Sequence, residues 1–218
     1  MKVLAIYGAS GFGREVLELA QIINRSEKRW DSFVFIDDGD VDPIISGCKV
    51  YKYHDAITEY NDEIEVVVGI GEPIIRESIF EKLRKDGVYS PNLVHPGVYI
   101  PESTKLGKGV VIQYGCFISC NAQIKDYVYI QPQCNIGHDD VLSEGCMISG
   151  LCNLGGLVNV GKWSYLGLSS VVKQMITIGD YSIVGMGSVV QKDIPDLMIT
   201  MGNPARVIAK NERRRVFA

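Results

Sequence analysis

The chain has 218 residues, of which 46% are hydrophobic and 22% charged, and it carries a formal net charge of −4. This length accommodates one large domain or two modest ones, and the composition is that of an ordinary globular protein. The negative balance argues against a general affinity for nucleic acid or anionic membranes, and no apolar run approaches the roughly 18 residues of a membrane-spanning helix.

The chain opens with a lysine and a short apolar stretch, MKVLAIYGAS, so a secretory signal peptide has to be considered. The apolar part is shorter than the roughly 7–15 residues of a signal-peptide core, and it leads directly into a glycine loop and an amphipathic pattern. We therefore expect this stretch to be the first strand of the fold and the protein to be cytoplasmic.

Residues 1–92 alternate between strand-like and helix-like patterns. The strand-like segments are KVLAIYG at 2–8, SFVFIDD at 32–38 and IEVVVGIG at 64–71, and the helix-like ones are GREVLELAQIINRS at 13–26 and EPIIRESIFEKLRKDG at 72–87, closed by Gly87. Such alternation predicts a small parallel sheet with helices on its faces. It is about half the size of a dinucleotide-binding domain, so one nucleotide is the ligand size we expect.

The glycine loop from Gly8 to Gly13 follows the first strand and opens the first helix, so its backbone amides are placed to cradle a phosphate. It departs from G-x-G-x-x-G because Ser10 replaces the middle glycine. In NAD-binding folds the acid that binds the ribose follows the glycine loop by about 20 residues. Asp37 lies farther along the chain from Gly8 than that. An alternative is that these glycines only permit tight strand–helix turns.

Residues 93–200 follow a different rule, with an aliphatic residue at every sixth position. Counting in steps of six from 100 to 190, every position is Ile, Leu or Val: Ile100, Leu106, Ile112, Ile118, Ile124, Ile130, Ile136, Leu142, Ile148, Leu154, Val160, Leu166, Val172, Ile178, Val184 and Val190. Hexapeptide periodicity of this kind predicts a parallel β-helix. Three hexads make one coil, so we expect a triangular prism of about five coils.

A second series, mostly of small residues, follows each aliphatic residue by four positions. Its members are Thr104, Val110, Cys116, Ala122, Val128, Cys134, Asp140, Cys146, Cys152, Val158, Ser164, Ser170, Ile176, Ser182, Ser188 and Ile194. They precede the next aliphatic residue by two, so both series point to the same side of a short strand, into the prism. The cysteines of this series are expected to be buried packing residues rather than ligands or nucleophiles.

His138 interrupts the ladder in the stretch CNIGHDDVLSEG, at an outward-facing position. Counting by one coil places Gly156 above it, which predicts free space and an exposed backbone N–H next to the imidazole. A base beside a bare amide suits acyl transfer, because one group takes a proton and the other stabilises an oxyanion. The alternative is a solvated turn histidine.

Asp140 is the only charged member of the small inward series. A carboxylate in that corner must be hydrogen-bonded or neutralised. We expect it to accept hydrogen bonds from free backbone N–H groups of the turn.

Several segments together resemble one family: the hexad ladder, GASGFGREV and FIDD near the start, NIGHDD in the ladder and GNPARVIAK near the end. They resemble the hexapeptide-repeat sugar acyltransferases of the PglD/NeuD type, bacterial enzymes of cell-surface polysaccharide synthesis that acetylate nucleotide-activated amino sugars or sialic acids. The resemblance implies an α/β half-Rossmann nucleotide-sugar-binding domain over 1–92 and a left-handed β-helix acyltransferase domain over 93–200. Residues 201–218 would form a CoA-proximal turn and a basic tail. It also implies a homotrimer with active sites between subunits, acetyl-CoA as donor and no metal.

The resemblance assigns roles to individual residues. His138 would be the general base in a direct transfer, and Asp139 would orient it. The oxyanion and acetyl-CoA would be contacted by Gly156, Leu168, Met186, Asn203 and Pro204. The nucleotide sugar would be contacted by Ser10, Gly11, Phe12, Gly13, Asp37, Asp38 and Gly71. The tail KNERRRVFA either supplies positive charge to the CoA phosphates or is only a solvated surface.

Two departures bear on the acceptor. Phe12 and Met147 stand where the better-known amino-sugar enzymes carry histidines, so O-acetylation of a sialic acid or another sugar hydroxyl is an alternative to N-acetylation. A nucleotide-dependent oxidoreductase would leave the ladder unexplained. A zinc lyase of the γ-carbonic anhydrase type needs three histidine ligands per site, and the chain has His54, His95 and His138 in total. A non-catalytic binding scaffold is a further alternative.

Overall fold

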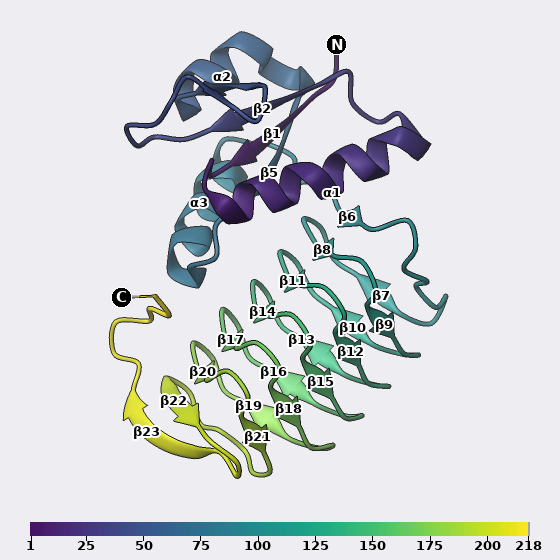
Figure 1. Cartoon of the computed structure of the whole chain (residues 1–218), viewed down its shortest axis with the longest axis vertical. Coiled ribbons are helices and arrows are strands. Elements are labelled where there is room, and N and C mark those ends of the chain that lie inside the picture. Colours follow the sequence, from purple (N-terminus) through teal and green to yellow (C-terminus); the bar gives the residue numbers. More distant parts are fainter. Residues whose placement is uncertain (218) are drawn as a thin grey trace. The chain divides into compact units, whose positions relative to one another are not determined.

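The computed structural model describes residues 1–217 and divides into two compact units (Figure 1). The first comprises Met1–Gly71 and Ile75–Pro91, and the second comprises Glu72–Ile74 and the chain from Asn92 onward.

The first unit is a five-stranded sheet with helices, in the strand order β3-β4-β2-β1-β5. Its elements are β1 (Val3–Tyr7), α1 (Gly11–Glu27), β2 (Ser32–Ile36), β3 (Ile44–Ile45), β4 (Cys48–Tyr51), α2 (Tyr53–Tyr60), a 3-10 turn (Asn61–Glu63), β5 (Ile64–Val68) and α3 (Pro73–Lys85). The predicted parallel sheet is confirmed: β1 pairs in parallel with β2 and β5, and β2 with β4. Sequence reasoning missed α2 and the antiparallel pair β3–β4.

The central strand β1 forms because VLAIY is a continuous apolar run, and all five of its residues are buried. A strand buried on both faces reads as such a run in parallel sheets. Helix α1 packs on β1 and buries the apolar stripe that its sequence spacing predicts, including Val16, Ala20 and Ile23.

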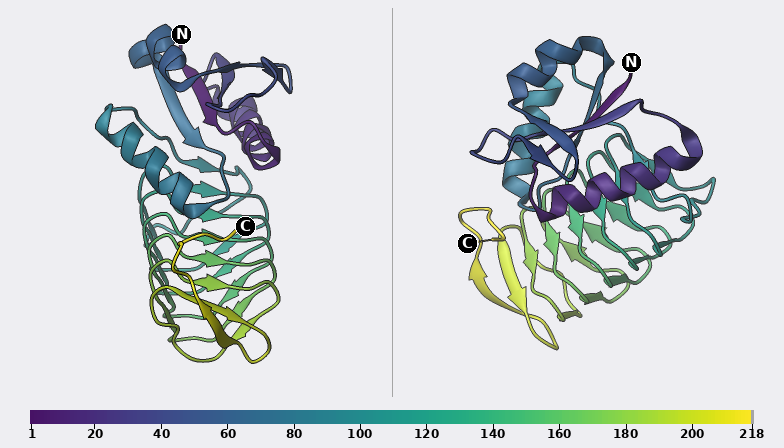
Figure 2. Two further views of the ribbon diagram at one scale, coloured as in Figure 1. Left: turned by 90° about the vertical axis from the view of Figure 1, so that its left-hand side faces the viewer. Right: turned by 45° about the horizontal axis from the view of Figure 1, so that its top comes forward.

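The second unit is a left-handed parallel β-helix with three sheets. Its strands are β6 (Leu93–Val94), β7 (Lys105–Leu106), β8 (Val111–Ile112), β9 (Phe117–Ile118), β10 (Gln123–Ile124), β11 (Tyr129–Ile130), β12 (Asn135–Ile136), β13 (Val141–Leu142), β14 (Met147–Ile148), β15 (Asn153–Leu154), β16 (Asn159–Val160), β17 (Tyr165–Leu166), β18 (Val171–Val172), β19 (Thr177–Ile178), β20 (Ile183–Val184), β21 (Val189–Val190), β22 (Met198–Met201) and β23 (Arg206–Lys210). Strands of successive coils stack in parallel, as Figure 2 shows, and β22–β23 closes the stack as an antiparallel pair.

The register confirms the 18-residue coil and corrects its last turn. Gln123 pairs with Val141, one full coil later, but Ile178 bridges Ile194 only sixteen residues later. The sequence series placed Ile194 among the small corner residues; that assignment is wrong. The last coil is two residues shorter, so Ile194 takes the aliphatic position that the six-residue count would give to Asp196.

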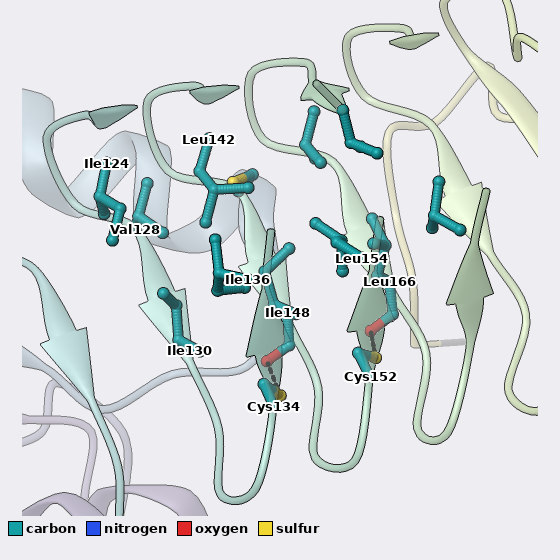
Figure 3. Packing of buried hydrophobic residues seen from close by; sticks show 14 of the residues in the cluster. Ile124, Val128, Ile130, Cys134, Ile136, Leu142, Ile148, Cys152, Leu154 and Leu166 are labelled. Carbon is teal, nitrogen blue, oxygen red and sulfur yellow. Dashed lines mark hydrogen bonds between the residues drawn. The ribbon is translucent and has the colours of Figure 1, made fainter. Parts of the chain in front are cut away.

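The interior of the prism is lined mainly by aliphatic side chains, with the Cys134 and Cys152 thiols in one corner (Figure 3). The predicted packing role of the cysteines is confirmed: Cys116, Cys134, Cys146 and Cys152 are buried free thiols. The Cys134 thiol lies 3.0 Å from the Ser149 carbonyl oxygen, to which it donates. A small hydrophobe with a weak S–H donor therefore fills the corner and satisfies a backbone acceptor at once.

Each turn between strands places one residue in the left-handed region of backbone space. These positive-φ residues recur every six positions: Gly109, Gly115, Asn121, Tyr127, Gln133, Asp139, Gly145, Leu151, Leu157, Trp163, Ser169, Met175, Tyr181 and Gly187. Most are not glycine, although this region favours glycine and tolerates Asn and Asp best among the others. The stacked coils therefore impose the turn geometry, and Asp139 adopts φ +59° in a conformation that suits its residue type.

Candidate active site

His138 and Asp139 lie in the turn between β12 and β13, two strands labelled in Figure 1. The His138 Nδ1 and Asp139 Oδ2 atoms are 2.8 Å apart, and the two side chains are 54% and 41% exposed. Hydrogen bonds with His138 and with Asn121 lower the pKa of Asp139, so its carboxylate is ionised and accepts a hydrogen bond from Nδ1–H. In the neutral imidazole Nε2 then carries the lone pair, which is the protonation state a general base needs.

The imidazole packs directly over Gly156 in the next coil. A Cβ atom added to Gly156 would lie 2.5 Å from Cε1 and 2.7 Å from Cδ2 of His138, and still closer to Nε2. The ring therefore fills the place that the missing side chain leaves, and the prediction of open space there is wrong. The Gly156 N–H donates no hydrogen bond within the described chain, whereas the neighbouring Leu157 N–H donates to the His138 carbonyl.

Asp140 lies beneath the same turn and is fully buried. Its Oδ2 accepts a hydrogen bond from Gly137 N at 2.7 Å, and its Oδ1 accepts one from Val158 N at 2.8 Å. The expectation that this carboxylate binds backbone N–H groups of the turn is therefore confirmed. Burial raises the pKa of Asp140 to about 6, because these two bonds and the nearby His138 offset desolvation only in part.

The residues predicted on the donor side lie on a different edge of the prism from His138. Leu168 and Met186 occupy equivalent turns one coil apart, joined by the hydrogen bond from Gly187 N to Leu168 O, and both side chains are exposed. Asn203 and Pro204, linked by a cis peptide bond, lie in the turn from β22 to β23. That turn continues the edge, because Gly202 N donates to Ser188 Oγ.

The residues predicted to bind the nucleotide converge at one edge of the first sheet. The loop from Gly8 to Gly13, the pair Asp37–Asp38 and the segment from Gly69 to Gly71 follow the neighbouring strands β1, β2 and β5. Carboxyl ends of adjacent parallel strands form the usual ligand crevice of such sheets.

The glycine loop is shaped by close packing. A Cβ atom on Gly13 would overlap the Gly8 carbonyl and stand 2.9 Å from its carbon atom. Ser10 precedes α1 as its N-cap and makes no side-chain cap, while Gly11 and Phe12 begin the helix. Asp37 closes the loop from the other side: its carboxylate accepts hydrogen bonds from Ala9 N at 3.0 Å and Gly39 N at 2.9 Å. The glycines thus have a packing role whether or not a phosphate binds.

Asp38 lies in a cluster that the sequence did not reveal. Its carboxylate accepts hydrogen bonds from the Tyr7 hydroxyl and from Tyr53 N, and Lys82 Nζ is 3.8 Å away. Burial acts to raise the pKa of Asp38, but the bonds from Tyr53 and Tyr7 outweigh it and lower that pKa. Lys82 also lies over the Tyr53 ring, 3.6 Å from its centroid. Tyr53 begins α2, whose sequence shows no clear helical spacing of apolar residues. No sequence motif therefore indicated the cluster around Asp38.

The basic tail is docked on the β-helix. Arg214 lies over the Tyr181 ring at 4.2 Å, and Val216 N and Phe217 N donate to the buried Glu72 carboxylate. A cavity of about 440 Å³ beside it is lined by Ile199, Lys210, Asn211, Glu212, Arg213, Arg215, Val216 and Phe217. A role in binding CoA phosphates remains a prediction.

Met147, expected to stand where the better-known amino-sugar enzymes carry a histidine, is buried on β14. Within residues 1–217, no group of three or more His, Cys, Asp or Glu side chains is placed to hold a metal ion. Among the helices described, none is long and apolar enough to cross a membrane.

Comparison with known proteins decides the relationship. Residues 3–83 match the family model of the PglD N-terminal domain. The chain is 26% identical over 181 residues to GDP-perosamine N-acetyltransferase of Escherichia coli O157:H7, covering 80% of this chain and 79% of that protein. The crystal structure of PerB from Caulobacter crescentus with CoA and GDP-perosamine matches 96% of this chain and 98% of its own, at 27% identity and a TM-score of 0.87. The chain is homologous to GDP-perosamine N-acetyltransferase, and its first domain matches the PglD N-terminal domain.

Two further comparisons give the same kind of match. The acetyltransferase domain of PglB from Neisseria gonorrhoeae FA1090, solved with acetyl coenzyme A, matches 95% of this chain and 99% of its own, at 28% identity and a TM-score of 0.88. An acyl-carrier-protein–UDP-N-acetylglucosamine O-acyltransferase of Stutzerimonas stutzeri is 32% identical over 140 residues, but the match spans only 54% of that protein. The resemblance and the fold predicted from the sequence are both confirmed.

Proposed function

We propose that this protein transfers the acetyl group of acetyl-CoA to the amino group of a nucleotide-linked amino sugar. One observation carries the proposal: an exposed, hydrogen-bonded His138–Asp139 pair lies on a β-helix turn of this chain. A match over 96% of the chain to a protein solved with CoA and GDP-perosamine also supports it. Acetyl-CoA is accordingly the co-substrate, and no resident metal is part of the proposal.

The geometry supports direct transfer in a ternary complex. The sugar nitrogen attacks the thioester carbonyl carbon, so that a C–N bond forms and the C–S bond breaks. His138 Nε2 takes the proton lost by the nitrogen and passes it to the departing CoA thiolate. Asp139 holds Nδ1–H and stabilises the imidazolium that forms. The Gly156 N–H, which has no partner in the described chain, is the candidate donor to the oxyanion.

Assembly of the site requires a second copy of the chain. His138 and the donor residues Leu168 and Met186 occupy different edges of one prism. A homotrimer with acetyl-CoA between neighbouring subunits would bring them together. Mixing an inactive His138→Ala protein with an inactive Met186→Trp protein, after brief denaturation and refolding together, should restore activity in mixed oligomers. Persistent inactivity of the mixture, with mass measurements showing mixed trimers, would contradict shared sites.

The acceptor nucleotide is proposed to bind at the carboxyl edge of the first sheet. The contacts would come from Ser10, Gly11, Phe12, Gly13, Asp37, Asp38 and Gly71. The proposed reaction takes place in the cytoplasm and supplies an acetylated sugar for cell-surface polysaccharide. These assignments rest on the convergence of the three loops at a ligand crevice of this fold class.

The deciding experiment measures CoA release with UDP-, dTDP- and GDP-linked 4-amino sugars and with CMP-sialic acid, followed by mass spectrometry of the product. We expect a hydroxylamine-resistant amide from one of the amino sugars. A hydroxylamine-sensitive ester would favour O-acetylation. This alternative is supported by the partial similarity to UDP-N-acetylglucosamine O-acyltransferases. No CoA release and no binding of any donor or acceptor would favour a scaffold.

A further inference from the structure

Among the described residues, one series of backbone hydrogen bonds between the coils of the β-helix is interrupted at a single place, immediately before His138. In each hexad the N–H after the inner aliphatic residue donates to a carbonyl of the next coil, as Ser119 does to Ile136 and Gly155 to Val172. Every other such N–H in the described ladder, from Gly107 to Gly185, makes this bond. Gly137 does not, although Leu154 lies where its acceptor should be.

The loss is visible in the pairing as well. Strands β12 and β15 pair only through Asn135 and Asn153, whereas β12 and β9 pair through two residues each. The Leu154 carbonyl accepts no hydrogen bond in the described chain. A buried backbone acceptor without a partner is costly, so something must hold Gly137 away from it.

Asp140 provides the competing acceptor. Its carboxylate takes the Gly137 N–H at 2.7 Å and also the Val158 N–H at 2.8 Å. The first belongs to the peptide unit that leads into His138, and the second belongs to the turn that carries Gly156. One carboxylate therefore joins the two turns that form the candidate site.

Other corners show what a neutral residue does at this position. Ser164 Oγ accepts the N–H of Ser182, one coil later, and donates its own proton to Gly179 O at 2.7 Å. The carbonyl equivalent to Gly179 O at the Asp140 corner belongs to Gly155. An ionised carboxylate has no proton to donate there, and it binds the Gly137 N–H instead.

We propose that Asp140 is a positioning residue for His138, holding the preceding peptide out of the β-helix ladder through its ionised carboxylate. This inference rests on the proposed function of His138. When Asp140 is protonated, its hydroxyl can donate to the Gly155 carbonyl as the serines do, and Gly137 is free to rejoin Leu154. The turn then has two arrangements, and only the ionised one places the imidazole as described.

The ionisation of Asp140 falls in a range where such a change can be observed. The titratable groups around it are His138 and Asp139 in its own turn and Cys120 in the turn one coil earlier; the turn one coil later, Gly155 to Val158, carries none. Burial raises the pKa of Asp140 to about 6.

The first test needs no variant. In protein labelled with nitrogen-15 glycine, the Gly137 amide signal should move with pH around a midpoint near the pKa of Asp140, about 6. In Asp140→Asn the same signal should not move in that range. A wild-type Gly137 signal that is unchanged through the range would overturn the proposal, whether or not the protein transfers acetyl groups.

The second test separates positioning from packing. Asp140→Ser restores the small residue of other corners, and we expect kcat to fall about tenfold or more, with KM for acetyl-CoA within about twofold and no loss of thermal stability. Ser164→Ala is the matched control, because it removes the same kind of corner hydrogen bonds away from His138 and should leave kcat unchanged. An Asp140→Ser enzyme with wild-type kcat would sink the proposal while leaving the proposed transferase activity intact.

Discussion

Replacing Gly156 by alanine tests the contact on which the candidate site is built. The new methyl would lie 2.5 Å from His138 Cε1, about an ångström inside ordinary van der Waals contact, so the imidazole must swing away. The ring is 54% exposed and free to move outward, so the stability cost should stay near that of an off-rotamer side chain, about 0.5–1.5 kcal/mol. Displacing the base by about 1 Å should lower kcat about a hundredfold.

The assay is steady-state CoA release at saturating donor and acceptor, with thermal unfolding measured in parallel. Gly150→Ala is the stability control, because its added methyl would stand 3.5 Å from Leu168 Cδ2 and from the Pro132 carbonyl oxygen, which is ordinary contact. We expect similar melting temperatures for both variants and a large loss of kcat in Gly156→Ala. Wild-type turnover in Gly156→Ala would refute the reasoning, because a ring packed as described cannot remain in place.

Two further predictions concern stability. Gly13→Ala should destabilise the first unit by about 1–3 kcal/mol in urea unfolding, since the added carbon overlaps the Gly8 carbonyl; an unchanged midpoint would contradict that packing. The folded-state pKa of Asp140 is raised to about 6 from 3.8, so the protonated form of Asp140 favours folding and the ionised form disfavours it. The favourable contribution to the free energy of unfolding is complete below pH 3.8 and is lost as pH rises through 6. The loss amounts to about 3 kcal/mol, and Asp140→Asn should remove that slope from the pH dependence of unfolding; an identical slope in both proteins would contradict it.

The sequence was sufficient for the β-helix because one coil determines the next. Each hexad repeats the same backbone geometry, so a single period assigns the interior, the turns and the outward position of His138. The same regularity hid the error at Ile194. An isoleucine fits both the aliphatic and the corner series, and only the pairing with Ile178 reveals that the coil is shorter by two residues.

The details of the site depend on competition between groups, which a period does not report. Counting placed Gly156 above His138 correctly, but whether the gap stays open or receives the ring depends on the imidazole rotamer. The charge of Asp140 was visible in the sequence, whereas its capture of the Gly137 N–H from Leu154 is a balance between two acceptors. The cluster around Asp38 needed the placement of α2, which has little periodic signal.

The most direct test of the central claim is the turnover of His138→Asn with acetyl-CoA and the best nucleotide-linked amino sugar. Asparagine keeps a polar side chain at the turn but cannot accept the proton of the attacking amine. We predict that kcat falls about 10²–10⁴-fold while the melting temperature, the oligomeric mass and the affinity for acetyl-CoA stay at their wild-type values. A kcat close to that of the wild type would contradict the account, because it would leave the transfer without its base.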